Sequence, residues 1–230
     1  MNRSFRLVPV GDALIVVQFE GDGDDRSALT AACAAAITAA AMPDVRDVVP
    51  TATTVGVYFD PAHTDPAHLT PYLHDLVSTA RPLAAARTRV IEVPVCYGGV
   101  YGPDLAEVAA FSALSEAEVV ALHTGRTYRV EMLGFAPGFA YLASVDPRVA
   151  MPRRREPRTR VPAGAVGIAA RCTGIYPVAS PGGWQIVGRT PLRVTDLTRP
   201  EPFLFAPGDT VRFAAIDADR FERLARVETV

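Results

Sequence analysis

The sequence of 230 residues contains no lysine, and all 23 of its basic residues are arginines. The lack of lysine excludes a P-loop lysine, a Schiff-base lysine and a biotinylated lysine from this chain. If the protein holds ATP or an acidic ligand, then arginine side chains, backbone amides or a partner protein must do so. The net charge of −2 also argues against a nucleic-acid partner, because proteins that bind nucleic acids are usually basic.

Cysteine and histidine are too few for a disulfide framework or a structural metal site. Cys33, Cys96 and Cys172 are an odd number at wide spacing, and no CxxC pair occurs. The four histidines do not show the spacing of metal ligands, so we expect no bound metal. Cys172 has no histidine near it in the sequence, which favours an inert side chain over a nucleophile.

Long apolar runs are also missing. The first residues, MNRSFRLVPVGD, lack the apolar stretch of a signal peptide. The most apolar run, residues 29–42, is mostly alanine and too short to cross a bilayer. We therefore expect a cytoplasmic protein with no membrane partner. A hydrophobic content of 49% with 21% charged residues is ordinary for a folded protein.

The first half of the chain predicts a small α/β domain. Residues 12–19 are typical of a buried strand, and Ser27 can cap a helix that Pro43 ends. Two strands follow, near residues 45–49 and 54–59. A second helix then starts at residues 64–66 or at residues 70–71, since proline suits the first helical position. The order βαββα makes one α/β core. Residues 81–89 show neither a helical nor a strand pattern, so we place the domain boundary there. The two predicted domains are residues 1–85 and 86–230.

The second half predicts a β-barrel, so that the whole chain has an α+β fold. After a first strand at residues 89–95 come two short helices, the second of which begins with a capping box of Ser115 and Glu118. Beyond Gly125 the helical period disappears. Short apolar strands then recur between glycines and prolines, near residues 128–133, 166–170, 184–187, 192–196 and 210–214. Many short strands with turn signals between them are typical of a closed or nearly closed barrel.

One stretch with candidate functional residues is GFAPGFAYL, residues 134–142. Its Pro137-Gly138 pair suits the centre of a type II turn, where glycine supplies the positive φ. That turn brings Phe135, Phe139 and Tyr141 close together. The three rings form either an aromatic core cluster under a loop or one wall of a substrate site.

A second stretch, residues 152–167, contains five arginines within eight positions. Arg153 and Arg158 each follow a proline, which restricts the backbone and can present a fixed guanidinium to a carboxylate or phosphate. We expect the other three to lie on a solvated face: Arg154, Arg155 and Arg160. Gly164 lets the backbone turn sharply or approach a ligand closely.

A third stretch, SPGGWQIVGRTP, covers residues 180–191. Gly182 and Gly183 form a turn in which the backbone can approach a ligand. Trp184, the single tryptophan, is expected in the core. Gln185 and Arg189 are four residues apart on a predicted strand, so their side chains share a face and could orient one ligand.

Taken together, these stretches resemble the family of allophanate hydrolase subunit 1, the kinase inhibitor KipI and the B subunit of bacterial 5-oxoprolinase. The resemblance runs from GDAL near the start through YFDP, PVCYGG and YGPDL to GFAPGFAYL, VPAGAVGIA, TGIYP and SPGGWQIVGRTP. Tyr176 of TGIYP joins the candidate orienting groups. The chain departs from the family pattern at Ala165, where serine is usual, and at Cys172, where glutamine is usual.

The resemblance implies a cyclophilin-like β-barrel behind the small α/β domain. It also implies partners, namely a homologous second protein of the type of allophanate hydrolase subunit 2 or the 5-oxoprolinase C subunit, and a third 5-oxoprolinase subunit. The complex would hydrolyse 5-oxo-L-proline to L-glutamate with ATP, which the complex rather than this chain could bind. This chain would have no activity alone.

Two other functions remain open. One is a KipI-like protein that inhibits a sensor histidine kinase through an exposed apolar or aromatic patch. The other is a part of a biotin-dependent urea or allophanate pathway, of the allophanate hydrolase subunit 1 type. In that pathway the biotin must be carried by another chain, because this one has no lysine.

Overall fold

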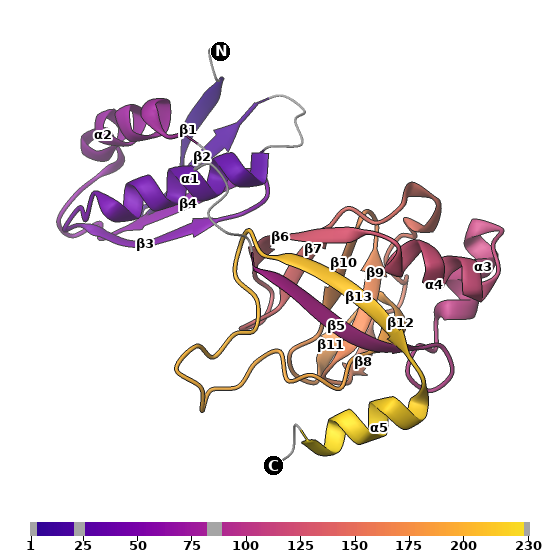
Figure 1. Ribbon diagram of the computed structural model, residues 1–230. Helices are drawn as coiled ribbons and strands as arrows, with labels where there is room; N and C mark the ends of the chain where they lie inside the picture. The colour runs from indigo at the N-terminus through magenta and orange to yellow at the C-terminus, as the bar shows by residue number, and fades with distance from the viewer. Residues whose placement is uncertain (1–3, 21–25, 82–88, 228–230) are drawn as a thin grey trace. The chain divides into compact units, whose positions relative to one another are not determined.

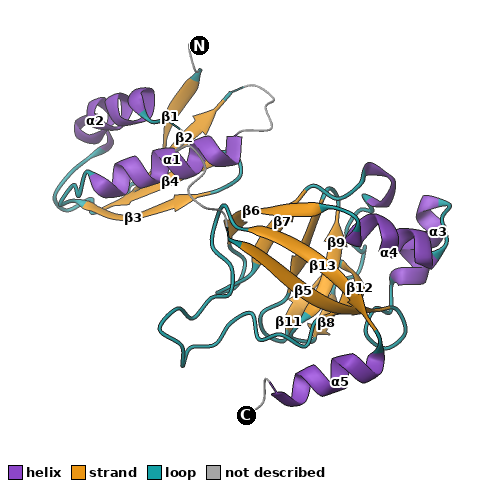
Figure 2. Ribbon diagram, viewed as in Figure 1, coloured by secondary structure: helices purple, strands orange, loops and turns teal. Residues whose placement is uncertain are grey.

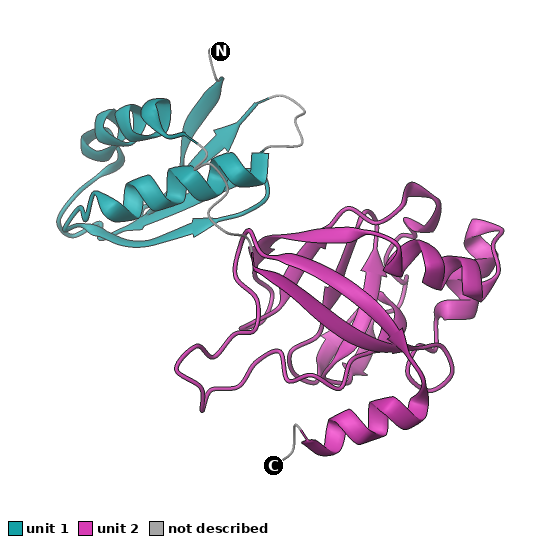
Figure 3. Cartoon of the chain, in the orientation of Figure 1, with its two compact units in different colours: residues 1–87 teal, residues 88–230 magenta. Residues whose placement is uncertain are grey.

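The chain forms two compact units, residues 1–87 and 88–230 (Figure 3). The computed structural model describes residues 4–20, 26–81 and 89–227. The predicted boundary between residues 85 and 86 lies outside these described residues. Each unit has its own hydrophobic core, and both combine helices with strands (Figure 2). The α+β class is therefore confirmed.

The first unit is a four-stranded antiparallel sheet with two helices on one face (Figure 1). The strands lie in the order β1-β2-β4-β3, with the bounds β1 Phe5–Val10, β2 Leu14–Phe19, β3 Val45–Pro50 and β4 Thr54–Phe59. The helices are α1 Arg26–Ala39 and α2 Pro66–Thr79. Alternate residues of β2 and β4 are buried under these helices, as a sheet with one covered face requires.

The element order is ββαββα, one strand more than predicted. The missed strand β1 lies at the edge of the sheet, and most of its side chains are exposed. It therefore lacks the alternation of buried and exposed residues that marks a core strand, and it contains Pro9, which edge strands tolerate. The second helix begins at the earlier of its two expected starts, where the Asp65 side chain accepts a bond from the His68 amide at 2.8 Å.

The opposite face of this sheet carries apolar side chains that no described helix covers. The strand register pairs Val8 with Val16 and Val10 with Leu14, and Leu14 with Tyr58 on the next strand. We call this surface the open sheet face and define it by Val8, Val10, Leu14, Val16, Val49 and Tyr58. Val10 is 48% exposed and Tyr58 is 44% exposed. Side chains that adjoin across strands in this way make one continuous apolar patch.

The second unit is a closed seven-stranded barrel, as predicted. Its strands lie in the order β10-β7-β6-β13-β5-β12-β9, and β10 pairs with β9 to close it. Only β5 and β13 pair in parallel; the other pairs of the barrel are antiparallel. The bounds are β5 Val90–Tyr97, β6 Thr127–Leu133, β7 Ala140–Ala143, β9 Ala165–Ala169, β10 Cys172–Ile175, β12 Gln185–Arg189 and β13 Thr210–Ile216.

Several elements surround the barrel. Helices α3 Leu105–Ser112 and α4 Glu116–Thr124 lie beside the barrel (Figure 1). Their buried side chains belong to the barrel core. The predicted capping box begins α4, because Ser115 and Glu118 bond each other's backbone amides. The remaining elements are a short helix η1 Pro147–Val149, a separate strand pair of β8 Arg158–Val161 and β11 Ser180–Gly182, and the helix α5 Ala218–Val227.

The strand predicted at residues 192–196 is wrong. This segment makes an isolated bridge between Thr195 and Phe203, and further backbone bonds join it to Pro202 and Leu204 of the same short return segment. It is therefore a folded loop and not a barrel strand. Within the described parts of the chain, no helix has the length and apolar character needed to cross a membrane.

Candidate functional site

The second and third candidate stretches lie side by side on the outside of the barrel. Strands β8 and β11 pair with Gly182 opposite Arg158. The Arg154 amide donates to the Gly183 carbonyl at 2.8 Å, and the Gln185 side-chain amide donates to the Pro152 carbonyl at 3.0 Å. Residues far apart in the sequence thus form one surface.

The aromatic cluster, which we define as Phe135, Phe139, Tyr141, Tyr176 and Trp184, packs against this surface. The Phe139 ring lies at its centre, with centroid distances of 5.0 Å to Tyr141, 5.3 Å to Tyr176 and 5.4 Å to Trp184. Phe139, Tyr176 and Trp184 are buried, whereas Phe135 is 64% exposed. The buried rings of Phe139, Tyr176 and Trp184 therefore belong to the core, as the first interpretation expected. Phe135 forms the exposed edge of the cluster, where a substrate wall would have to lie.

The turn that presents these rings has the predicted geometry. The Phe139 amide donates to the Ala136 carbonyl at 2.9 Å, and Gly138 has a φ of +83°, as position three of a type II turn requires. A Cβ atom at Gly138 would also lie 2.0 Å from the Thr195 hydroxyl. Only glycine fits this turn.

Gly182 and Gly183 differ in what lies beside them. A Cβ atom at Gly182 would lie 2.3 Å from the Tyr176 hydroxyl, so the absent side chain makes room for the protein's own buried ring. At Gly183 the nearest atoms would be those of Pro157 at 3.7 Å, and its carbonyl already accepts the Arg154 amide. Their expected approach to a ligand stays a prediction.

A buried carboxylate, Asp104, organises the arginines. It is 2% exposed and accepts bonds from both terminal nitrogens of Arg158, at 2.9 and 2.6 Å. Arg154 donates to the same carboxylate at 3.0 Å, and so does the Ile186 amide at 2.6 Å. The ion pair between Arg158 and Asp104 is therefore bidentate, which is the strong form of an ion pair and fixes the position of both side chains. The expectation that Arg154 lies on a solvated face is therefore wrong.

This arrangement changes the roles of the two arginines that follow prolines. The terminal nitrogens of Arg158 bond Asp104, so its guanidinium holds β8 against the barrel. Arg153 is exposed and makes no ion pair with any residue that the structure describes. Burial raises the pKa of Tyr141, and the nearby charge of Arg153 opposes that shift. Arg153 is thus an unpaired cation beside the aromatic cluster, while Arg155 and Arg160 are exposed, as expected.

Asp104 was given no role in the sequence analysis. The carboxylate precedes α3 but makes no capping bond to that helix. Its partners Arg154 and Arg158 lie 50 and 54 residues away, and Ile186 lies 82 residues away. The only signal was its place in the stretch YGPDL.

Gln185 and Arg189 are not brought to one ligand. Gln185 is buried, and its side-chain oxygen has no partner among the described residues. The Arg189 Nε instead donates to the Ala163 carbonyl at 2.9 Å, and its guanidinium carbon lies 5.9 Å from the centre of the Phe221 ring. The register of β12 shifts between Ile186 and Gly188, which breaks the two-residue alternation on which the prediction rested.

Arg189 instead lines a groove together with Gly164, between the barrel and α5. The groove has a volume of about 230 Å³, and we call it the arginine groove. Its lining residues are Ala163, Gly164, Pro177, Arg189, Thr190, Pro191, Leu192, Arg193, Thr195, Phe221 and Ala225. Gly164 has a φ of +78°, and a Cβ atom there would lie 2.4 Å from the Thr190 carbonyl oxygen. Tyr176 does not line the groove, but its backbone carbonyl accepts a hydrogen bond from the amide of the lining residue Gly164 at 2.8 Å.

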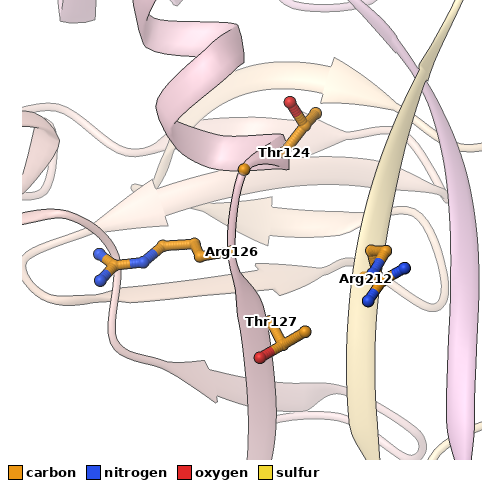
Figure 4. Close-up of a pocket in the computed structure, with 5 residues that line it drawn as sticks. Thr124, Arg126, Thr127 and Arg212 are labelled. Atoms are coloured by element: carbon orange, nitrogen blue, oxygen red, sulfur yellow. The ribbon is translucent and has the colours of Figure 1, made fainter.

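A second depression lies where α4 ends, and it is lined by Thr124, Gly125, Arg126, Thr127 and Arg212. Its two arginines extend in different directions and do not converge on one point (Figure 4). It also lies at the carboxyl end of a helix, where the helix dipole disfavours an anion. The arginine groove is therefore the better anion site.

The barrel interior holds a chain of polar groups that the sequence did not reveal. His123, fully buried on α4, lies 2.7 Å from the Tyr97 hydroxyl through Nδ1 and 2.9 Å from the Thr173 hydroxyl through Nε2. Thr173 donates its own proton to the Gly167 carbonyl at 2.9 Å, so it must accept from Nε2–H. Nδ1 then accepts from Tyr97. A neutral His123 satisfies every bond, and burial lowers its pKa to about 3.

The thiol of Cys172, which packs beside the aromatic cluster, is not an activated nucleophile. Burial raises the pKa of the Cys172 thiol, and the charge of Glu131 adds to this shift. A raised thiol pKa means less thiolate, the reactive form. Among the residues that the structure describes, no three His, Cys, Asp or Glu side chains could hold a metal ion.

Comparison with known proteins gives a consistent result. Residues 5–205 match the family described as the carboxyltransferase domain, subdomain C and D. The chain is 37% identical to the 5-oxoprolinase B subunit of Bacillus subtilis over 227 residues, which are 94% of this chain and 95% of that protein. It is 56% identical to the 5-oxoprolinase B subunit of Escherichia coli O157:H7 over 126 residues, which are 55% of this chain and 58% of that protein.

A solved structure extends the similarity to three dimensions. The crystal structure of TTHA0988 matches with a TM-score of 0.77 and 39% identity, covering 89% of this chain and 40% of that chain. The present chain therefore spans about two fifths of that longer protein.

Proposed function

We propose a function on the premise that this chain belongs to the family of the carboxyltransferase domain, subdomains C and D. Within that family it acts as the B subunit of an ATP-dependent 5-oxoprolinase, which converts 5-oxo-L-proline, ATP and water to L-glutamate, ADP and phosphate. The observation that carries this function is the similarity to the Bacillus subtilis protein, which extends over nearly the full length of both chains.

The side chains on the outside of the barrel fit a binding role better than a catalytic one. They offer guanidinium groups and aromatic surface, and Cys172 has a raised pKa. Catalysis therefore belongs to the complex, in which this chain holds or orients an anionic group. The groups that we expect to contribute are Arg153 beside the aromatic cluster, Phe135 at its exposed edge, and Arg189 in the arginine groove.

We place ATP on another member of the complex. The arginine groove, at about 230 Å³, is smaller than the roughly 300–1,000 Å³ of pockets for drug-sized ligands. The depression at the end of α4, at about 670 Å³, is large enough, but its two arginines do not converge on one point (Figure 4). The chain also has no lysine to reach the terminal phosphates in the way a P-loop does. The requirement for ATP then arises only when the proteins of the complex assemble.

The open sheet face is the surface that we expect to meet another protein of the complex. The two related proteins are named as B subunits, which implies further subunits, and TTHA0988 continues well beyond the part that this chain matches. A partner must therefore cover some surface here. The open sheet face is continuous across β1, β2 and β4, with Val49 of β3 opposite Gly56, and its most exposed members are Val10 and Tyr58. A patch of this kind is typical of an interface.

The test is to produce the full chain together with its homologous second subunit and the third subunit, and to measure ATP hydrolysis with and without 5-oxo-L-proline. We expect ADP and glutamate to form together, only when the substrate is present, and only when this chain is included. Folded, associated subunits that hydrolyse no ATP with 5-oxo-L-proline would contradict the proposal. If the assembly hydrolysed no ATP and this chain inhibited a sensor histidine kinase in a separate assay, the regulatory alternative would be favoured.

A further inference from the structure

We infer that the arginine groove binds the carboxylate of a small organic acid. The inference rests on the proposed function only for the identity of that acid, which would be 5-oxo-L-proline. The existence of an anion site follows from the groove itself. It lies on the second unit alone, between the end of β12, the loop after it and α5.

The first support is the fixed position of Arg189. Its Nε is tied to the Ala163 carbonyl at 2.9 Å, and its guanidinium lies over the Phe221 ring at 5.9 Å. Phe221 is buried and held in turn by the Tyr101 ring, with centroids 4.5 Å apart. Neither terminal nitrogen of Arg189 has a partner among the described residues. The guanidinium of Arg189 is thus held through its Nε and lies over a ring. Its two terminal nitrogens remain able to donate to the two oxygens of a carboxylate.

The second support is the charge of the lining. Arg189 and Arg193 both line the groove, and no acidic residue does among those that the structure describes. The acid closest to Arg193 along the loop is Asp196, which does not line the groove and is bonded by Thr198 and by Arg199 at 3.2 Å. Hydrogen bonds from Thr198 lower the pKa of Asp196, and the charges of Arg199 and Arg193 lower it further, so Asp196 partly offsets the charge of Arg193. Two cations without a lining carboxylate favour an anion. The Thr190 hydroxyl accepts the Leu192 amide at 3.2 Å, so its proton remains available to a ligand oxygen.

The third support is size and shape. A volume of about 230 Å³ corresponds to roughly eight water molecules at about 30 Å³ each. That space suits a small metabolite and excludes a nucleotide. The apolar part of the lining includes Pro177, Pro191, Leu192 and Phe221. A compact ring with one carboxylate, such as that of 5-oxo-L-proline, matches an apolar wall with a cationic end.

The experiment is a binding titration of the full chain alone, by calorimetry and by the shift in thermal unfolding temperature. The probes are 5-oxo-L-proline, the neutral lactam 2-pyrrolidinone, and inorganic phosphate. We expect saturable binding of 5-oxo-L-proline, and little or none of the neutral lactam or of phosphate. Equal binding of 2-pyrrolidinone would overturn the role of the carboxylate. Equal binding of phosphate, with competition, would overturn the assignment to an organic acid.

Variants locate the binding. Arg189→Gln should weaken the affinity for 5-oxo-L-proline about tenfold or more, because it removes a charge-assisted bond. Arg193 is exposed, so Arg193→Gln should weaken it about threefold and leave folding intact. The matched control is Arg212→Gln, an exposed arginine of the other depression, which should leave the affinity unchanged. Unchanged affinity in Arg193→Gln and in folded Arg189→Gln would overturn the site.

This result can be separated from the proposed function. If the complex shows no ATP hydrolysis but the chain binds 5-oxo-L-proline through Arg189, then the proposed function fails and the groove stands. If the complex is active but the isolated chain binds no small carboxylate, then the groove assignment fails and the proposed function stands.

Discussion

The two units of the chain place their polar groups in opposite ways. The first unit buries aliphatic and aromatic side chains under its helices and leaves its open sheet face bare. The second unit buries a carboxylate with its two arginines, and it encloses a histidine in its barrel. Because buried charges and hydrogen bonds require specific partners, the second unit is rigidly specified and sensitive to loss of a partner. The first unit is more tolerant, and its distinguishing feature is a surface.

The largest effect should come from Asp104→Ala. This variant leaves Arg154 and Arg158 without their shared partner, and the Ile186 amide without an acceptor. Breaking a buried ion pair costs about 3–5 kcal/mol; since both arginine side chains are just under a third exposed, we expect about 3 kcal/mol. Urea denaturation followed by the fluorescence of Trp184 measures this loss, because the single tryptophan lies in the second unit.

The control for that variant is Glu156→Ala, which alters an exposed acid of the same unit in the segment before β8. It should change the free energy of unfolding by less than about 0.5 kcal/mol. If Asp104→Ala were as mild as this control, the buried ion pair would not support the second unit.

A smaller effect should follow from acid. Burial lowers the pKa of His123 to about 3 in the folded chain, whereas an unfolded histidine has a pKa near 6.5. Below pH 6.5 the unfolded chain binds a proton that the folded chain does not, so stability is lost as the pH falls. At pH 5, before most carboxylates titrate, the loss should be about 2 kcal/mol. Unfolding curves of the second unit between pH 7 and pH 5 measure it.

His123→Gln should flatten this pH dependence, because glutamine can donate and accept without taking up a proton. His74→Gln, on the exposed surface of the first unit, should keep the full dependence. A slope that survives in His123→Gln would assign the effect to another group.

The smallest effect on stability, with a large effect on assembly, should come from Val10→Arg. Val10 is 48% exposed, so the free energy of unfolding should change by less than about 0.5 kcal/mol. A charge within an apolar interface should nonetheless reduce recovery of the other subunits in co-purification. Tyr72→Arg on α2, which alters a 55% exposed residue away from that face, is the matched control. If Val10→Arg instead abolished self-association, the open sheet face would meet a second copy of this chain.

Elements with local signals could be predicted from the residues alone. The capping box of Ser115, the turn at Gly138 and the start of α2 at Pro66 follow from neighbouring residues, and each is present as predicted. The many short strands between glycines and prolines likewise indicated the barrel. The edge strand β1 escaped because an exposed strand with a proline carries no such local pattern.

The roles of the candidate residues depend on contacts between segments that are far apart in the sequence. Whether an arginine is free or paired depends on a carboxylate that the chain places some fifty residues away, as Asp104 is from Arg154 and Arg158. The register shift in β12 separated Gln185 from Arg189, and no spacing in the sequence encodes such a shift. Local propensity fixes where an element begins and ends, but a side chain's partner is set by packing between distant segments, and partners are what distinguish Arg189 from Arg158.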